Sequence, residues 1–189
     1  MSGKRASGRA SNGPAEDAGG RGAALAGGSS ASRRGRRVLL AISGGIAACK
    51  TPELVRTLDR MGLEVRCVLT PGAGQFVAPL VLQAFSHHPV RSELFDLSAE
   101  SEIDHIALAD WADLVIVAPA TAHLIARMAH GLADDLVTTL LLATRAPILL
   151  APAMNVNMWR HAATLENVER LRARGALVVG PDAGALACG

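Results

Sequence analysis

The chain has 189 residues, half of them apolar, which is enough for one α/β domain with a packed core. Its formal net charge of +2 is unevenly spread, because residues 1–37 hold eight Lys/Arg and two Asp/Glu while residues 38–189 carry a net charge of −4. The body of the chain therefore lacks the basic character of a nucleic-acid-binding domain. The sequence also shows neither a membrane-spanning apolar run nor a secretory signal.

The first 36 residues are predicted to form a leader that precedes the folded domain. Large apolar side chains are almost absent there, so the segment cannot bury enough surface to offset its ordering entropy, and we expect disorder. Its basic run at 33–37 is either a solvated approach to the first strand, which we favour, or a contact for RNA or an anionic surface. The folded domain is predicted to comprise residues 37–189.

From Arg37 onwards, apolar strands alternate with helices. Continuous apolar runs predict strands covered on both faces, over residues 38–42, 63–69, 113–118, 146–151 and 176–179. Helices are predicted over residues 50–61, 73–86 with a break at Pro79, 104–111, 121–128, 134–143 and 156–174. This alternation predicts a single three-layer α/β domain with a Rossmann-like or flavodoxin-like parallel sheet and right-handed crossovers.

Small and polar residues follow three of the predicted strands, at the sheet edge where α/β proteins bind ligands. The first such turn is Ser43-Gly44-Gly45-Ile46, where glycines allow close approach of the backbone and the next helix start favours a phosphate. The turn matches neither the GxGxxG nor the Walker pattern, and no acidic residue is placed for a ribose. A mononucleotide is therefore favoured over a dinucleotide, and a ligand-free turn is the alternative.

Polar side chains also end the other strands at this edge. Thr70 follows the second strand and Thr121 follows the turn at 118–120, and each is either a helix cap or a contact for a phosphate or a flavin edge. Asn155 follows the strand over 146–151 and offers two N–H donors and a carbonyl without adding charge. We expect these strand ends to share one pocket.

Two titratable residues are candidates for catalysis. His105, at a predicted helix start, is either a base or a surface residue. Cys188, flanked by small residues, can donate a proton or act as a nucleophile, whereas Cys49 and Cys67 are expected to be inert core residues. Three cysteines without metal-ligand spacing predict no metal site and a reducing, cytoplasmic compartment.

Taken in order, these motifs resemble the homo-oligomeric flavin-containing cysteine decarboxylases. The resemblance covers residues 37–189. The chain is similar above all to the coenzyme A biosynthesis branch of this family. The bacterial members of that branch are often the N-terminal half of a bifunctional protein with a phosphopantothenate–cysteine ligase. The motifs that carry it are Ser43-Gly44-Gly45-Ile46-Ala47-Ala48, His105-Ile106 with Trp111-Ala112-Asp113, Ala118-Pro119-Ala120-Thr121-Ala122, Pro152-Ala153-Met154-Asn155 with Met158-Trp159, and Ala187-Cys188-Gly189.

The resemblance implies FMN as the cofactor, bound at a subunit interface of a homotrimer or of a homododecamer built as a tetramer of trimers. The cofactor-binding residues that it implies are Ser43, Gly44, Gly45, Ile46, Thr70, Thr121, Ala122 and Ala153. His105 is implied as the base, supplied by a neighbouring subunit. Asn155 is implied to hold the substrate carboxylate beside Met158, and Cys188 to supply a proton from a flap.

The implied activity is that of a carboxy-lyase which converts 4′-phosphopantothenoylcysteine into 4′-phosphopantetheine. Oxidation of the thiol-bearing carbon by FMN gives a thioaldehyde, CO₂ then leaves with its electrons placed on sulfur, and a returned hydride with a proton from Cys188 completes the product. The sequence stops one residue after Cys188, whereas the family flap continues. We therefore expect a domain truncated at the flap and lacking a ligase half, with weakened decarboxylation if the protein ends there.

Three other functions stay open. A peptidyl-cysteine decarboxylase of the same fold releases the enethiol without reduction, and Cys188 argues against it. A flavin prenyltransferase has no need for His105 or the Asn155 motif. A non-catalytic subunit that regulates a phosphatase has no chemical reason to keep His105, Asn155 and Cys188 together.

Overall fold

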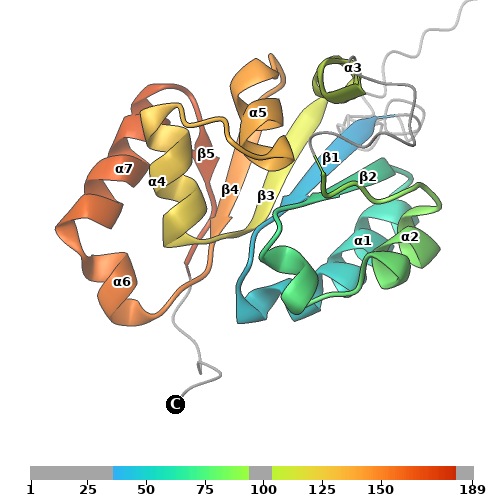
Figure 1. Cartoon of the computed structure of the whole chain (residues 1–189), viewed down its shortest axis with the longest axis horizontal. Helices are drawn as coiled ribbons and strands as arrows, with labels where there is room; N and C mark the ends of the chain where they lie inside the picture. Colours follow the sequence, from blue (N-terminus) through green and yellow to red (C-terminus); the bar gives the residue numbers. More distant parts are fainter. Residues whose placement is uncertain (1–35, 94–103, 182–189) are drawn as a thin grey trace, which may run out of the picture.

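A five-stranded parallel sheet forms the centre of the computed structural model, which describes residues 36–93 and 104–181 (Figure 1). The strands are β1 (Arg37–Ile42), β2 (Glu64–Leu69), β3 (Leu114–Ala120), β4 (Ile148–Pro152) and β5 (Leu177–Val178). The helices are η2 (Ile46–Lys50), α1 (Thr51–Arg60), η3 (Ala73–Gln75), α2 (Pro79–Ser86), α3 (Asp104–Trp111), α4 (Ala122–His130), α5 (Leu136–Ala143), α6 (Val156–Arg160) and α7 (Ala162–Ala173), of which η2 and η3 are 3₁₀ helices. The strand order β2-β1-β3-β4-β5 is flavodoxin-like and confirms the predicted fold class.

Helices cover both faces of the sheet, because successive residues of a strand point to opposite sides. Along β1, Leu39 and Ala41 join a core built with α3, α4, α5 and α7, whereas Leu40 and Ile42 join a second core built with α1 and α2. Figure 1 shows α1 and α2 grouped on one side of the sheet and α4 and α7 on the other. Two buried faces explain why the strands appear in the sequence as continuous apolar runs.

The helix predicted over 156–174 is two helices in the structure. His161 has an extended backbone, with φ −63° and ψ 133°, so α6 ends there and α7 begins. Its ring Nδ1 accepts a hydrogen bond from the backbone N–H of Ala163 at 3.2 Å and thereby caps α7. Histidine is not a common helix stop, which is why the apolar spacing alone suggested one continuous helix.

Helix α3 is fastened to the edge of the sheet where the strands begin. The guanidinium of Arg66 lies 4.3 Å from the ring centroid of Trp111, and Arg37 approaches the same ring at 5.8 Å. Arg37 also forms a salt bridge of 3.1 Å with Asp113. Its hydrogen bonds hold the pKa of Asp113 below the usual value, so this modest surface contribution to stability is lost only as the pH falls into the acid range.

Some predictions fall outside the described residues. They include the disordered leader over 1–36, apart from Arg36, and the flap that carries Cys188. Among the helices that the structure describes, none is both long enough and apolar enough to cross a lipid bilayer.

Candidate functional site

The main cavity, of about 980 Å³, opens where the strands end. In the sheet, β2 and β3 flank β1. The loop after β1 therefore leads toward the β2 edge of the sheet and the loop after β3 toward the opposite edge, and a crevice is left between the two loops. Turns after four strands contribute its walls: Ser43–Ile46 after β1, Thr70–Gly72 after β2, Thr121 after β3, and Ala153–Asn155 with Met158 after β4. The structure therefore brings together the strand ends that the sequence pointed to.

The glycine turn after β1 lies directly against the turn after β2. A Cβ atom added to Gly44 would stand 2.7 Å from the backbone carbonyl carbon of Gly72, and one added to Gly45 would stand 3.2 Å from Cγ2 of Thr121. Both glycines line the cavity, and the 3₁₀ helix η2 follows them before α1 begins. These positions are glycine because the backbone of one loop must closely approach its neighbours.

Replacing Gly44 with alanine is expected to lower the free energy of unfolding by about 1–3 kcal/mol, because the added methyl group meets rigid backbone. Gly74 offers a matched control, since its Cβ position meets nothing within 4 Å and its φ is not positive. Gly74→Ala is expected to stay within about 0.5 kcal/mol of the native protein in the same urea titration. Equal losses in the two variants would contradict the close approach at Gly44.

A hydrogen-bond network joins the ends of β1 and β3. The hydroxyl of Ser43 lies 2.6 Å from the carbonyl oxygen of Pro119 and 3.0 Å from Oγ1 of Thr121. It also accepts a hydrogen bond from the backbone N–H of Thr121 at 3.1 Å. Thr121 in turn caps α4 by accepting from the N–H of Leu124 at 3.4 Å. The expected capping role of Thr121 is present, and its hydroxyl also lines the cavity.

Asn155 stands at the end of β4 with its amide oriented by the backbone. Its side-chain carbonyl accepts a hydrogen bond of 2.8 Å from the N–H of Asn157 and so caps α6. This contact identifies which end of the side-chain amide is the oxygen. The other end, the NH₂ group, can donate to a ligand. Ala153, Met154 and Met158 line the cavity beside it. The arrangement suits an anionic group next to an apolar wall.

A charged wall lines the cavity on the side of α4, and its arginine and two aspartates were not predicted from the sequence. Arg127 contacts the carboxylates of Asp134 and Asp135, and its Nη1 lies 3.3 Å from Nε2 of His123. All four residues line the cavity. Asp135 also caps α5 in a capping box with Thr138, a sequence signal that could have marked this position.

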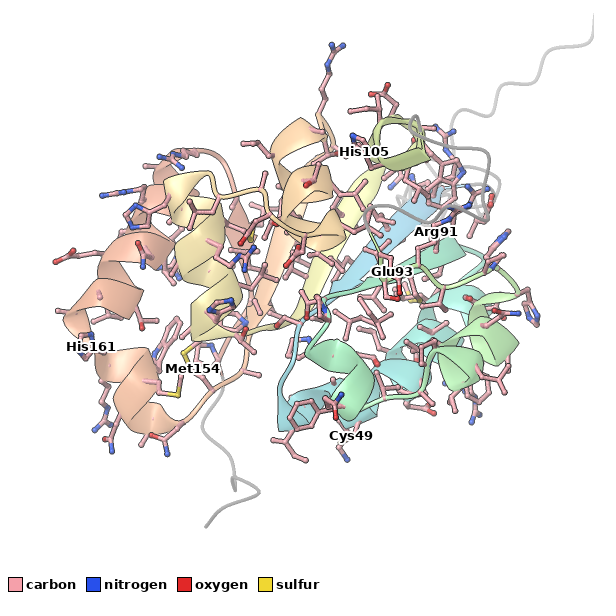
Figure 2. The ribbon with its side chains drawn as sticks, viewed as in Figure 1. Cys49, Arg91, Glu93, His105, Met154 and His161 are labelled. Atoms are coloured by element: carbon pink, nitrogen blue, oxygen red, sulfur yellow. The ribbon has the colours of Figure 1, made fainter. Side chains whose placement is uncertain are left out.

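Two of the predicted site residues lie outside the cavity lining. His105 is on α3, toward the end of the sheet where the strands begin, whereas Met154 and Cys49, which line the cavity, lie toward the other end (Figure 2). Ala122 is the first residue of α4 and is not part of the lining, although its neighbours Thr121 and His123 are. Cys188 lies outside the described residues.

The two described cysteines differ in exposure. Cys67 is buried in β2, and burial raises the pKa of its thiol to about 12, so it stays protonated and inert. Cys49 is exposed and lines the cavity, which corrects the expectation that both are core residues. In the part of the chain that the structure describes, no group of three or more His, Cys, Asp or Glu side chains could hold a metal ion.

The sequence matches the family model described as Flavoprotein over residues 27–189. The chain is 56% identical over 155 residues to the coenzyme A biosynthesis bifunctional protein CoaBC of Escherichia coli strain K12, an alignment covering 82% of this chain and 38% of that protein. It is 48% identical over 154 residues to the CoaBC protein of Bacillus subtilis strain 168, with the same two coverages. The chain thus spans about two fifths of the length of these relatives.

Solved structures that resemble this chain include decarboxylases. One is a Cys-to-Ser variant of PPC decarboxylase complexed with pantothenoylaminoethenethiol, with a TM-score of 0.74 and 33% identity, covering 82% of this chain and 87% of that one. Another is the FMN-dependent cysteine decarboxylase SpaF, with a TM-score of 0.72 and 34% identity, covering 76% of this chain and 83% of that one.

Proposed function

Because the chain belongs to the Flavoprotein family, we propose that it binds FMN in the main cavity and decarboxylates 4′-phosphopantothenoylcysteine to 4′-phosphopantetheine in coenzyme A biosynthesis. The observation that supports this most directly is the contact of the Gly44 turn with Gly72 at the crevice beside β1 and β3. A doubly wound sheet of this order binds a mononucleotide at that crevice.

Several features of the cavity support the binding of FMN. Gly44 and Gly45 present backbone without side chains, and the start of η2 adds N–H groups suited to a phosphate. Ile46, Thr70 and Ala153 line the remaining walls that we assign to the cofactor. When bound, FMN supplies the reversible two-electron chemistry that allows CO₂ to leave from a carbon next to an oxidised, sulfur-bearing one.

The residues of the chain itself orient the substrate and move protons. The NH₂ group of Asn155, which lines the cavity, donates to the substrate carboxylate, and the hydrogen bond that its side-chain carbonyl accepts from Asn157 restricts the rotation of the amide. Met158 packs beside the substrate. His105 takes a proton during oxidation of the thiol-bearing carbon, and Cys188 returns one at the end.

We assign the active unit to a homo-oligomer, a trimer or a tetramer of trimers, because His105 is remote from the cavity of its own chain (Figure 2). A neighbouring subunit can supply it. The sheet also offers an incompletely covered surface for such contact. Leu149 and Ala151 of β4 are only partly buried on the face covered by α1 and α2, and Leu177 of β5 is 57% exposed.

The relatives are bifunctional proteins, and we infer that the chain corresponds to their decarboxylase portion. We infer that the ligase half implied by the resemblance corresponds to the part of these relatives outside the alignment. The free thiols of Cys49 and Cys67 fit a reducing compartment, and we assign the enzyme to the cytoplasm on that ground.

Alkylation of Cys49 tests where the flavin lies. We expect iodoacetamide to modify Cys49 in the flavin-free protein and to react much more slowly once FMN is added, because the thiol lines the cavity. Cys67 serves as an internal control, because its buried, protonated thiol reacts only after unfolding. Peptide mass spectrometry follows both residues. Saturating FMN that leaves the rate at Cys49 unchanged would place the flavin elsewhere.

A further inference from the structure

Ser43 lines the main cavity, yet its hydroxyl is directed into the protein. The residue is 2% exposed, and its Oγ lies 2.6 Å from the carbonyl oxygen of Pro119, the shortest of its contacts. The same oxygen accepts the backbone N–H of Thr121 at 3.1 Å and lies 3.0 Å from Oγ1 of Thr121. These contacts tie the end of β1 to the turn that follows β3, on either side of the crevice.

The hydroxyls of Ser43 and Thr121 differ in whether their proton is available to a ligand. A serine hydroxyl can donate one hydrogen bond, and Ser43 donates it to the carbonyl oxygen of Pro119. A phosphate at neutral pH mainly accepts hydrogen bonds, so it needs donors that Ser43 no longer has. Because the Ser43 proton is bonded to Pro119, Thr121 must be the donor in the 3.0 Å contact between the two hydroxyls. The Thr121 proton can rotate from Ser43 toward the cavity, while Oγ1 continues to accept from the N–H of Leu124.

We propose that Ser43 is a positioning residue for the FMN site. It orients Thr121, a cofactor contact already implied by the resemblance, across the crevice, so that the hydroxyl of Thr121 and not that of Ser43 donates to the phosphate. This inference rests on the proposed function and refines it. The backbone N–H of Thr121 is held by Ser43, so loss of the serine hydroxyl releases the turn and misdirects the threonine. Ser43 therefore acts on the ligand only through Thr121.

A double-mutant cycle tests this dependence, with FMN and riboflavin titrated into flavin-free protein at a temperature where each variant is shown to be folded. The variants are Ser43→Ala, Thr121→Val and the combination of the two. Thr121→Val removes the hydroxyl and keeps the shape, whereas Thr121→Ser keeps the hydroxyl and is the matched control. Riboflavin lacks the phosphate, so it reports losses that are unrelated to phosphate binding.

We expect each single variant to weaken FMN binding by about tenfold, equivalent to 1.4 kcal/mol, and Thr121→Val to leave riboflavin binding nearly unchanged. Adding Ser43→Ala to Thr121→Val is expected to cause little further loss of FMN, because the route through Thr121 is already gone. Thr121→Ser is expected to bind FMN like the native protein.

Two results would overturn the assignment. If the FMN losses of the single variants multiply in the double variant, Ser43 acts on the phosphate independently of Thr121. If Thr121→Val binds FMN as tightly as the native protein, its hydroxyl makes no such contact, and this arm remains decisive even when Ser43→Ala does not fold. Failure of the native protein to bind FMN would instead contradict the proposed function.

Discussion

Replacing His105 with asparagine is expected to lower CO₂ release from 4′-phosphopantothenoylcysteine by at least about a hundredfold, the usual contribution of a general base. Asparagine keeps a polar side chain of similar size but cannot take up a proton at neutral pH. FMN binding is expected to be unchanged, because His105 does not line the cavity of its own chain. Radiolabelled CO₂ release and FMN titration measure the two properties separately.

His130→Asn is the matched control for this change. His130 lies on the exposed last turn of α4 and does not line the cavity, so its loss is expected to affect neither property. If His105→Asn keeps the native rate of CO₂ release, the base is another residue. If both variants lose activity equally, the loss reflects protein stability and not proton transfer.

Asn155→Asp is expected to lower kcat/KM by about a hundredfold, since a charge-assisted hydrogen bond is lost and a like charge faces the substrate carboxylate. Aspartate preserves the fold at this position, because it caps a helix as well as asparagine and still accepts the N–H of Asn157. The substitution thus replaces the donor with a negative charge and keeps the helix cap. Steady-state kinetics measure the loss, and thermal unfolding is expected to show little change.

Asn157→Asp provides a control with the same change of charge two residues away. Asn157 is exposed in α6 and does not line the cavity. A similar loss of kcat/KM in both variants would indicate a general electrostatic effect of added negative charge, and the contact between Asn155 and the carboxylate would then be unsupported.

Combining His105→Asn chains with Asn155→Asp chains distinguishes a site shared between subunits from a site contained within one chain. If His105 acts in the cavity of a neighbouring subunit, coexpressed His105→Asn and Asn155→Asp chains form some sites with both native residues. Random mixing of equal amounts restores about a quarter of the sites, because each native residue is present half of the time. Mixed oligomers that stay inactive would show that each chain needs both residues of its own.

Much of the fold could be predicted because the strands are buried on both faces. The run Val38–Ile42 has no polar residue, so periodicity and length identify it as a strand without further information. The split at His161 could not be predicted, because it depends on a ring nitrogen that caps the next helix. Sequence patterns register apolar spacing and not the local backbone angle of a single residue.

Some residues of the candidate site could likewise be predicted from the sequence, and others could not. Ser43, Gly44, Thr121 and Asn155 were predictable, because each follows a strand at the edge where the carboxyl ends of parallel strands meet. Arg127 was not, since it lies in the second turn of α4 and reaches the cavity wall only through packing of α4 beside α5. The inward direction of the Ser43 hydroxyl likewise depends on contacts 76 residues away in the chain.

Titration of flavin-free native protein with FMN tests the central claim most directly. A Gly44→Ala variant, still folded at the working temperature, is titrated in parallel with Gly74→Ala. We predict that the native chain and Gly74→Ala each bind one FMN per chain, whereas Gly44→Ala binds at least about tenfold more weakly because its glycine cradle is displaced. A native chain that takes up no FMN, or a Gly44→Ala variant that binds it with unaltered affinity, would contradict a flavin site at the crevice beside β1 and β3.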